Sequence, residues 1–352
     1  MAYRYPDSHV FYRKLGRDFP RIVRGDGCYL YDENGKRYLD AVGGAYVANL
    51  GHSNPEIADA LARQARSFGY LSGTAFTHGP VEELAAELAA TLPGDLDKLY
   101  FLSSGSEAVE AALKLARQYW VESGKPGKHK IIALAPGYHG NTLLALSASA
   151  REHYKTMFRE WLVDVHRVPA SYPYRCRCRG QDPQCPVCSG AVLEDAIAGG
   201  SGDFLHAQTF SHHPVACAAG LAAVRYLKQH KLVERCAQLG VVLHQRLAPL
   251  KALPHVGDVR GRGLLAGIEF VEDKATRAPF PRTARFAETF TDAALEAGLT
   301  VWPNVGHADG VNGDLVLVAP PFIITEGEID EVVALLARAL QDTLKAVKAV
   351  AQ

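Results

Sequence analysis

The sequence has no excess of charge of either sign and no long apolar run. Its 352 residues include 38 basic and 38 acidic side chains, a balance that does not favour a polyanionic partner. No uninterrupted apolar stretch is long enough to span a bilayer, and the amino terminus carries no apolar export signal. We therefore expect no nucleic-acid partner, no membrane segment and a cytoplasmic location.

The seven cysteines are an odd number, which favours reduced thiols over a disulfide framework. Four of them lie in a proline- and arginine-rich loop at 169–190: Cys176, Cys178, Cys185 and Cys188. Two close thiolate pairs are a pattern that can hold zinc tetrahedrally. The C-x-C spacing of the first pair is not the usual half of such a site, so a surface loop with unligated cysteines stays the alternative.

The stretch from Leu99 to Trp120 has the pattern of a strand, a tight turn and a helix. Leu99 to Leu102 is a continuous apolar run, which predicts a buried strand. Ser104 and Glu107 stand in the S-x-x-E spacing of a capping box, and an apolar face follows at helical spacing. Serine and glycine at this turn leave backbone N–H groups free at the positive end of the helix. Such a turn suits a phosphate group.

The residues of this turn and helix, SSGSEAVEAALKLAR from Ser103, resemble the cofactor-phosphate loop of the class III (ω-type) aminotransferases. These are fold type I enzymes that depend on pyridoxal 5′-phosphate. A second phrase, PGYHGNT at 136–142, resembles the family segment whose aromatic residue stacks on the pyridine ring. The resemblance implies pyridoxal 5′-phosphate as the cofactor and the following cofactor-binding residues: Ser104, Gly105, Ser106, Tyr138 and His139.

Two further segments resemble the same family. The phrase around Thr209 is similar to the one in which a threonine reaches the cofactor phosphate of the neighbouring subunit, which implies a homodimer. The segment from Tyr29 to His52 resembles the amino-terminal part of the family, in which the residue at the Tyr46 position lines the substrate pocket. Packing of Tyr46 beneath the preceding hairpin is an equally weighted alternative.

The alternation of strands and helices predicts an α/β protein. The resemblance implies the fold type I of pyridoxal-phosphate-dependent transferases, with a mostly parallel sheet flanked by helices, here truncated, and a small α+β carboxy-terminal domain. We expect an arm and hairpin at 1–50, a large cofactor-binding domain at 51–230 and the small domain at 231–352. Within the hairpin, Asn34-Gly35 predicts a two-residue turn.

The interval between Tyr138 and Thr209 lacks two groups that the chemistry needs. Transamination requires a lysine for the Schiff base and a carboxylate beside the pyridine nitrogen, and in the family both lie in this interval. Its one lysine, Lys155, has no glycine beside it, and we interpret it as part of a solvated helix face. A strand–helix–strand unit takes about thirty residues. The interval is therefore too short for the several further strands that the resemblance implies there. We infer a deletion of roughly a hundred residues near 197–200.

The resemblance implies transfer of an amino group from an amine or ω-amino acid to a keto acid. No catalytic residue is identified, so we expect this chain to be inactive, and its exposed sheet edges predict poor stability. Two alternatives stay open. One is a non-catalytic remnant that binds the cofactor phosphate or a partner. The other is a different fold type I activity, such as an aminomutase or a decarboxylase.

Overall fold

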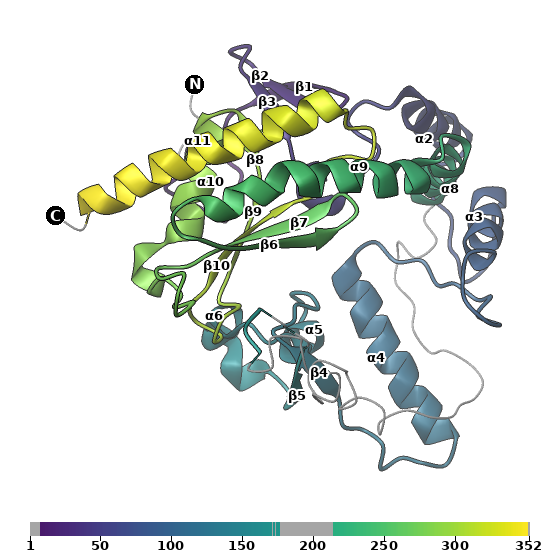
Figure 1. The fold of residues 1–352 in the computed structure, drawn as a ribbon. Helices are drawn as coiled ribbons and strands as arrows, with labels where there is room; N and C mark the ends of the chain where they lie inside the picture. The colour runs from purple at the N-terminus through teal and green to yellow at the C-terminus, as the bar shows by residue number, and fades with distance from the viewer. Residues whose placement is uncertain (1–7, 171, 173, 177–213, 351–352) are drawn as a thin grey trace. The chain divides into compact units, whose positions relative to one another are not determined.

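The computed structural model describes residues 8–170, 172, 174–176 and 214–350 (Figure 1). They form two compact units, which we describe separately. Unit 1 combines the chain up to Pro55 with 226–304 and 314–352, whereas unit 2 combines 56–225 with 305–313. The first unit thus holds both the amino-terminal hairpin and most of the carboxy-terminal part of the chain, and the expected division at 1–50, 51–230 and 231–352 stays a prediction.

The first sheet of unit 1 contains the predicted hairpin. Its four strands are ordered β1-β2-β3-β8. They span Ile22–Asp26, Tyr29–Asp32, Arg37–Asp40 and Leu299–Thr300. The turn has three residues rather than two, because Asp32 N–H donates to the Lys36 carbonyl at 3.0 Å and Gly35 takes a φ of 80°. The Asp32 carboxylate stabilises this longer loop by accepting the N–H groups of Asn34 and Lys36, both at 2.9 Å.

The second sheet of unit 1 has the order β6-β7-β10-β9. Its strands are Val256–Arg262, Leu265–Phe270, Asp314–Val318 and Trp302–Val305. Helices α9 (Leu232–Leu247) and α11 (Glu326–Val350) lie side by side against this sheet, with α10 (Phe286–Glu296) next to α11 (Figure 1). Apolar side chains between these layers, such as Phe270 and Phe286, form a buried core. Three short elements complete the unit: α1 (Gly43–Tyr46), η3 (Ala248–Ala252) and η4 (Arg282–Ala284).

Unit 2 is mainly helical around a small parallel sheet. Strands β4 (Ile132–Ala135) and β5 (His166–Pro169) pair in parallel. The helices are α2 (Pro55–Ser67), α3 (Gly79–Ala89), α4 (Gly105–Glu122), α5 (Leu143–Ala148), α6 (Glu152–Lys155), η1 (Thr156–Trp161) and α8 (Pro214–Gln229). Side chains of α3 and α8 form a separate small core. None of the described helices combines the length and the apolar character that crossing a membrane requires.

The strand predicted at Leu99–Leu102 does not form. This segment has no regular secondary structure, and its residues are exposed or half-buried. An extended apolar segment becomes a strand only when it pairs, and in the described part of unit 2 the one sheet is β4–β5. The apolar face of α4 is likewise thinly covered, because Ala111 is its one fully buried residue. Both observations indicate that α4 lacks sheet partners among the described residues.

Candidate functional site

The amino terminus of α4 has the predicted capping box. Ser104 is the N-cap, and its hydroxyl accepts the N–H of Glu107 at 3.3 Å. The Glu107 carboxylate reaches back to the N–H of Ser103 at 3.0 Å. The first N–H groups of a helix have no intrahelical acceptor, so those of Gly105 and Ser106 are left to bind an anion at the positive end of the helix. A Cβ at Gly105 would meet no described atom within 4 Å, so the space beside this turn is open.

The turn lies directly against the segment 136–142, which contains Tyr138. Asn141 N–H donates to the Ser106 hydroxyl at 3.1 Å. Gly140 packs so closely that a Cβ there would lie 2.6 Å from Ser106 Oγ, and its φ is +136°. On the next turn of α4, the Glu110 carboxylate accepts the N–H groups of Leu144 and Ala145 at 3.1 and 3.2 Å. Helix α4 therefore positions the Tyr138 segment through side chains on two successive turns.

Tyr138 leaves aromatic surface available to a ligand, and the turn after it holds buried polar atoms without partners among the described residues. The Tyr138 ring is 49% exposed and lies 6.2 Å from the ring of Tyr154. His139 N–H donates to the Ser149 hydroxyl at 2.9 Å, which holds the backbone of this turn. The His139 Nε2 and Thr142 Oγ1 atoms are buried, and neither has a hydrogen-bond partner among the described residues. Buried polar atoms without a partner are uncommon and call for one, so this turn fits a polar ligand.

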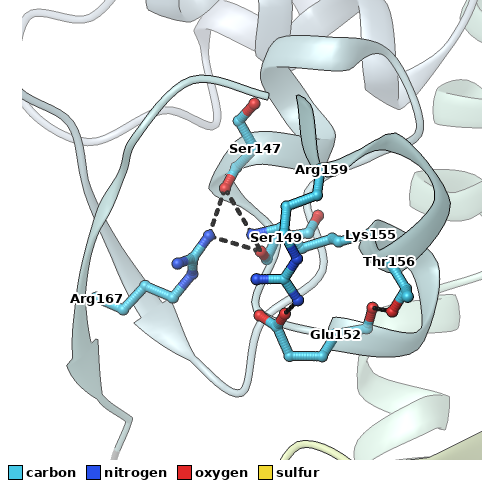
Figure 2. A network of polar contacts seen from close by, with 7 residues as sticks. All are labelled: Ser147, Ser149, Glu152, Lys155, Thr156, Arg159 and Arg167. Carbon is cyan, nitrogen blue, oxygen red and sulfur yellow. Dashed lines mark hydrogen bonds and ion pairs between the residues drawn. The ribbon is translucent and has the colours of Figure 1, made fainter. Parts of the chain in front are cut away.

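Lys155 is buried, which makes the interpretation of a solvated helix face wrong. It is only 6% exposed, and its ammonium donates to the carbonyls of Ser149 at 3.3 Å and Ser147 at 3.5 Å. Arg167 donates to the same two carbonyls at 3.4 and 2.8 Å (Figure 2). Desolvation by burial and the nearby Arg167 charge lower the pKa of Lys155. Its charged neighbours Glu152 and Arg159 form an ion pair with each other at 2.8 Å. Their closeness in sequence therefore does not show that Lys155 is exposed.

Lys155 is a residue of this site that sequence reasoning missed. Together with Arg167 it fixes the carbonyls at the end of α5, and the hydroxyl of Ser149 in the same stretch holds His139. Helix α6 supplies Lys155 and strand β5 supplies Arg167 (Figure 2). The only local signal in the sequence is a lysine placed shortly after a short apolar helix, which many surface lysines share.

The remaining predicted site residues stay predictions. Tyr46 belongs to unit 1, where its half-exposed ring lies 6.1 Å from that of Trp302. This contact is compatible with either role considered for Tyr46. Thr209 lies outside the described residues, as do three of the four loop cysteines, Cys178, Cys185 and Cys188. Cys176 is half-buried, and no group of three or more potential ligands that could hold a metal occurs in the described part of the chain. Zinc therefore gains no support there.

The comparisons with known proteins all point to aminotransferases. The family model described as aminotransferase class-III matches residues 13–196 and 184–340. An uncharacterised aminotransferase of Schizosaccharomyces pombe is 30% identical, with 96% of each chain covered. An (S)-enantioselective omega-transaminase from Thermomicrobium roseum is 26% identical, with a TM-score of 0.83 over 96% of this chain and 97% of that one. An omega transaminase of Pseudomonas jessenii in complex with PMP, at 24% identity, has the same TM-score over 97% and 98% of the two chains.

The match with the fission yeast protein is longer than the chain itself. It runs over 444 positions, whereas the chain has 352 residues, so at least 92 positions of the comparison have no counterpart here. The family model matches in two pieces rather than one, and the two pieces overlap at 184–196. Together the two pieces of the family model extend from residue 13 to residue 340. The chain therefore belongs to the class III aminotransferases, with the fold type I architecture of that family and pyridoxal 5′-phosphate as the cofactor that membership implies.

Proposed function

We propose that this chain binds pyridoxal 5′-phosphate through its phosphate and ring but does not carry out transamination. The observation that carries the first half is the contact between the α4 turn and the Tyr138 segment, made by Asn141 N–H and Ser106 Oγ. The N–H groups of Gly105 and Ser106 would hold the phosphate, and Tyr138 would pack against the ring. When bound, the cofactor supplies an electron sink for chemistry at an amine carbon.

The second half of the proposal, that the chain does not carry out transamination, rests on the groups that the cofactor's chemistry needs. The one lysine between Tyr138 and Thr209 is Lys155, and two backbone carbonyls already hold its ammonium. The comparison positions without a counterpart are numerous enough to include the family's lysine and pyridine-nitrogen carboxylate. We therefore derive no catalytic step for this chain. Its substrates by descent are an amine or ω-amino acid and a keto acid.

The test uses pyridoxamine 5′-phosphate, because this ligand carries the phosphate and ring but has no aldehyde to react with a lysine. We expect saturable binding, measured by calorimetry, and at least tenfold weaker binding of pyridoxamine, which lacks the phosphate. A Gly105→Pro variant removes one N–H donor while keeping the helix, since proline is favoured at the first helical position. We expect its affinity for pyridoxamine 5′-phosphate to fall by about tenfold, the effect of losing one charge-assisted hydrogen bond.

Gly105→Ala is the matched control, because it retains the N–H and its Cβ meets no described atom within 4 Å. It should lose less affinity than Gly105→Pro. Absence of phosphate-dependent binding by the parent chain would refute the first half of the proposal. For the second half, pyridoxal 5′-phosphate is added, treated with borohydride and mapped by mass spectrometry. Stoichiometric attachment to one lysine, together with amino-transfer activity, would contradict it.

We further propose a homodimer, since the family threonine at the Thr209 position reaches the phosphate of the neighbouring subunit. Light scattering coupled to size-exclusion chromatography measures the mass directly. A Thr209→Ala variant should retain the dimer mass and bind pyridoxamine 5′-phosphate several-fold more weakly. If the parent chain has a monomeric mass and still binds pyridoxamine 5′-phosphate, a site shared between two subunits is contradicted.

A further inference from the structure

Unit 2 contains a large cavity that the cofactor site does not use. Its volume is about 860 Å³, which lies within the range of small-molecule sites. One wall is the face of α4 that carries Leu113, Ala116 and Trp120, and the other includes Ile132 of β4 and Leu144 of α5. These side chains are the apolar surface that the two-stranded sheet leaves uncovered. The walls are therefore predominantly hydrocarbon.

The charged side chains among the described residues that line the cavity are all basic. Lys114 and Arg117 line it from α4, and Lys128 and Lys130 line it from the segment that leads into β4. No aspartate or glutamate is among the described residues that line it. A lining whose charged side chains are all positive attracts anions.

The cationic segment is held in place against α4. The Arg117 guanidinium donates to the carbonyl of Pro126 at 2.8 Å. The Lys128 ammonium lies 4.1 Å from the centre of the Trp120 ring, a cation–π contact on the apolar wall itself. The positive charges thus lie beside the apolar surface in a defined arrangement.

We propose that this cavity binds a straight-chain fatty carboxylate, with the alkyl chain on the Leu113–Trp120 wall and the carboxylate among the lysine and arginine side chains. The apolar wall favours an alkyl chain. The basic side chains of the lining favour a carboxylate over a neutral or cationic head group. The site is separate from the turn at Gly105 and Ser106, so this proposal does not depend on the proposed function.

The test is calorimetric titration with octanoate, decanoate and dodecanoate below their micelle concentrations. We expect one saturable site per chain, with affinity rising roughly tenfold for each two methylene groups buried. Dodecyltrimethylammonium, which has the same chain and the opposite charge, should bind at least tenfold more weakly than dodecanoate. Equal affinity for the two, or no saturable dodecanoate binding, would overturn the proposal.

A pair of adjacent substitutions locates the site. Ala116→Glu adds a negative charge to the cavity wall at an exposed position of α4, where glutamate is a good helix former. Leu115→Glu adds the same charge to the preceding residue, which is 45% exposed and is not among the residues that line the cavity. We expect Ala116→Glu to weaken dodecanoate binding at least tenfold and Leu115→Glu to change it less than threefold. Equal effects of the two would place the ligand elsewhere. Gly105→Pro should leave dodecanoate affinity unchanged, and this separates the two sites.

Discussion

Replacing Gly140 by alanine should destabilise unit 2 by an amount that the structure allows us to work out. Its φ of +136° lies in a region that residues with a side chain rarely adopt, a strain of about 1–3 kcal/mol. A Cβ would also lie 2.6 Å from Ser106 Oγ and 3.0 Å from Ser106 Cα. Moving Ser106 away breaks the hydrogen bond from Asn141, a net loss of about 0.5–1.5 kcal/mol. We expect a total loss of roughly 2–4 kcal/mol in the free energy of unfolding.

The assay is urea unfolding followed by tryptophan fluorescence, since Trp120 and Trp161 both belong to unit 2. Gly127→Ala is the matched control, because its Cβ would meet no described atom within 4 Å, and it should stay within about 0.5 kcal/mol of the parent. Hydrogen exchange of the Asn141 amide, measured by mass spectrometry, should accelerate in the Gly140→Ala variant alone. An unfolding midpoint equal to that of the parent would refute the close packing of the two segments.

Two further predictions concern buried ionisable groups. Because the pKa of Lys155 is lowered in the folded chain, the unfolded chain binds more protons just below the ordinary lysine pKa, so stability should rise as the pH approaches that pKa from below. Lys155→Met should flatten this rise in urea melts, and an unchanged slope would show that Lys155 is not its source. Burial raises the pKa of Cys28 to about 12 and that of Cys217 to about 11, so both should resist iodoacetamide at about pH 8 until urea is added. Peptide mapping that finds Cys28 alkylated in the native chain would contradict its burial.

Local spacing in the sequence was sufficient for several features of the site. The capping box at Ser104 and Glu107 and the helix that follows it formed as predicted. The same spacing makes a second capping box at Thr325 and Glu328. Each depends on groups only three or four residues apart, so their interaction is encoded in one short segment. The prediction that no lysine suits the cofactor likewise depends only on the composition of one interval, in which Lys155 is the one lysine.

Only the tertiary structure decided which segments meet and which stay without partners. Leu99–Leu102 has the composition of a strand, yet it forms none, because a strand exists only beside another strand. Lys155 has charged neighbours in sequence, yet it is buried, because its partners are the carbonyls at the end of α5 and its outward neighbours pair with each other. The need for glycine at 140 comes from Ser106, far away in the chain. Burial, pairing and close approach are relations between distant residues, and no local pattern specifies them.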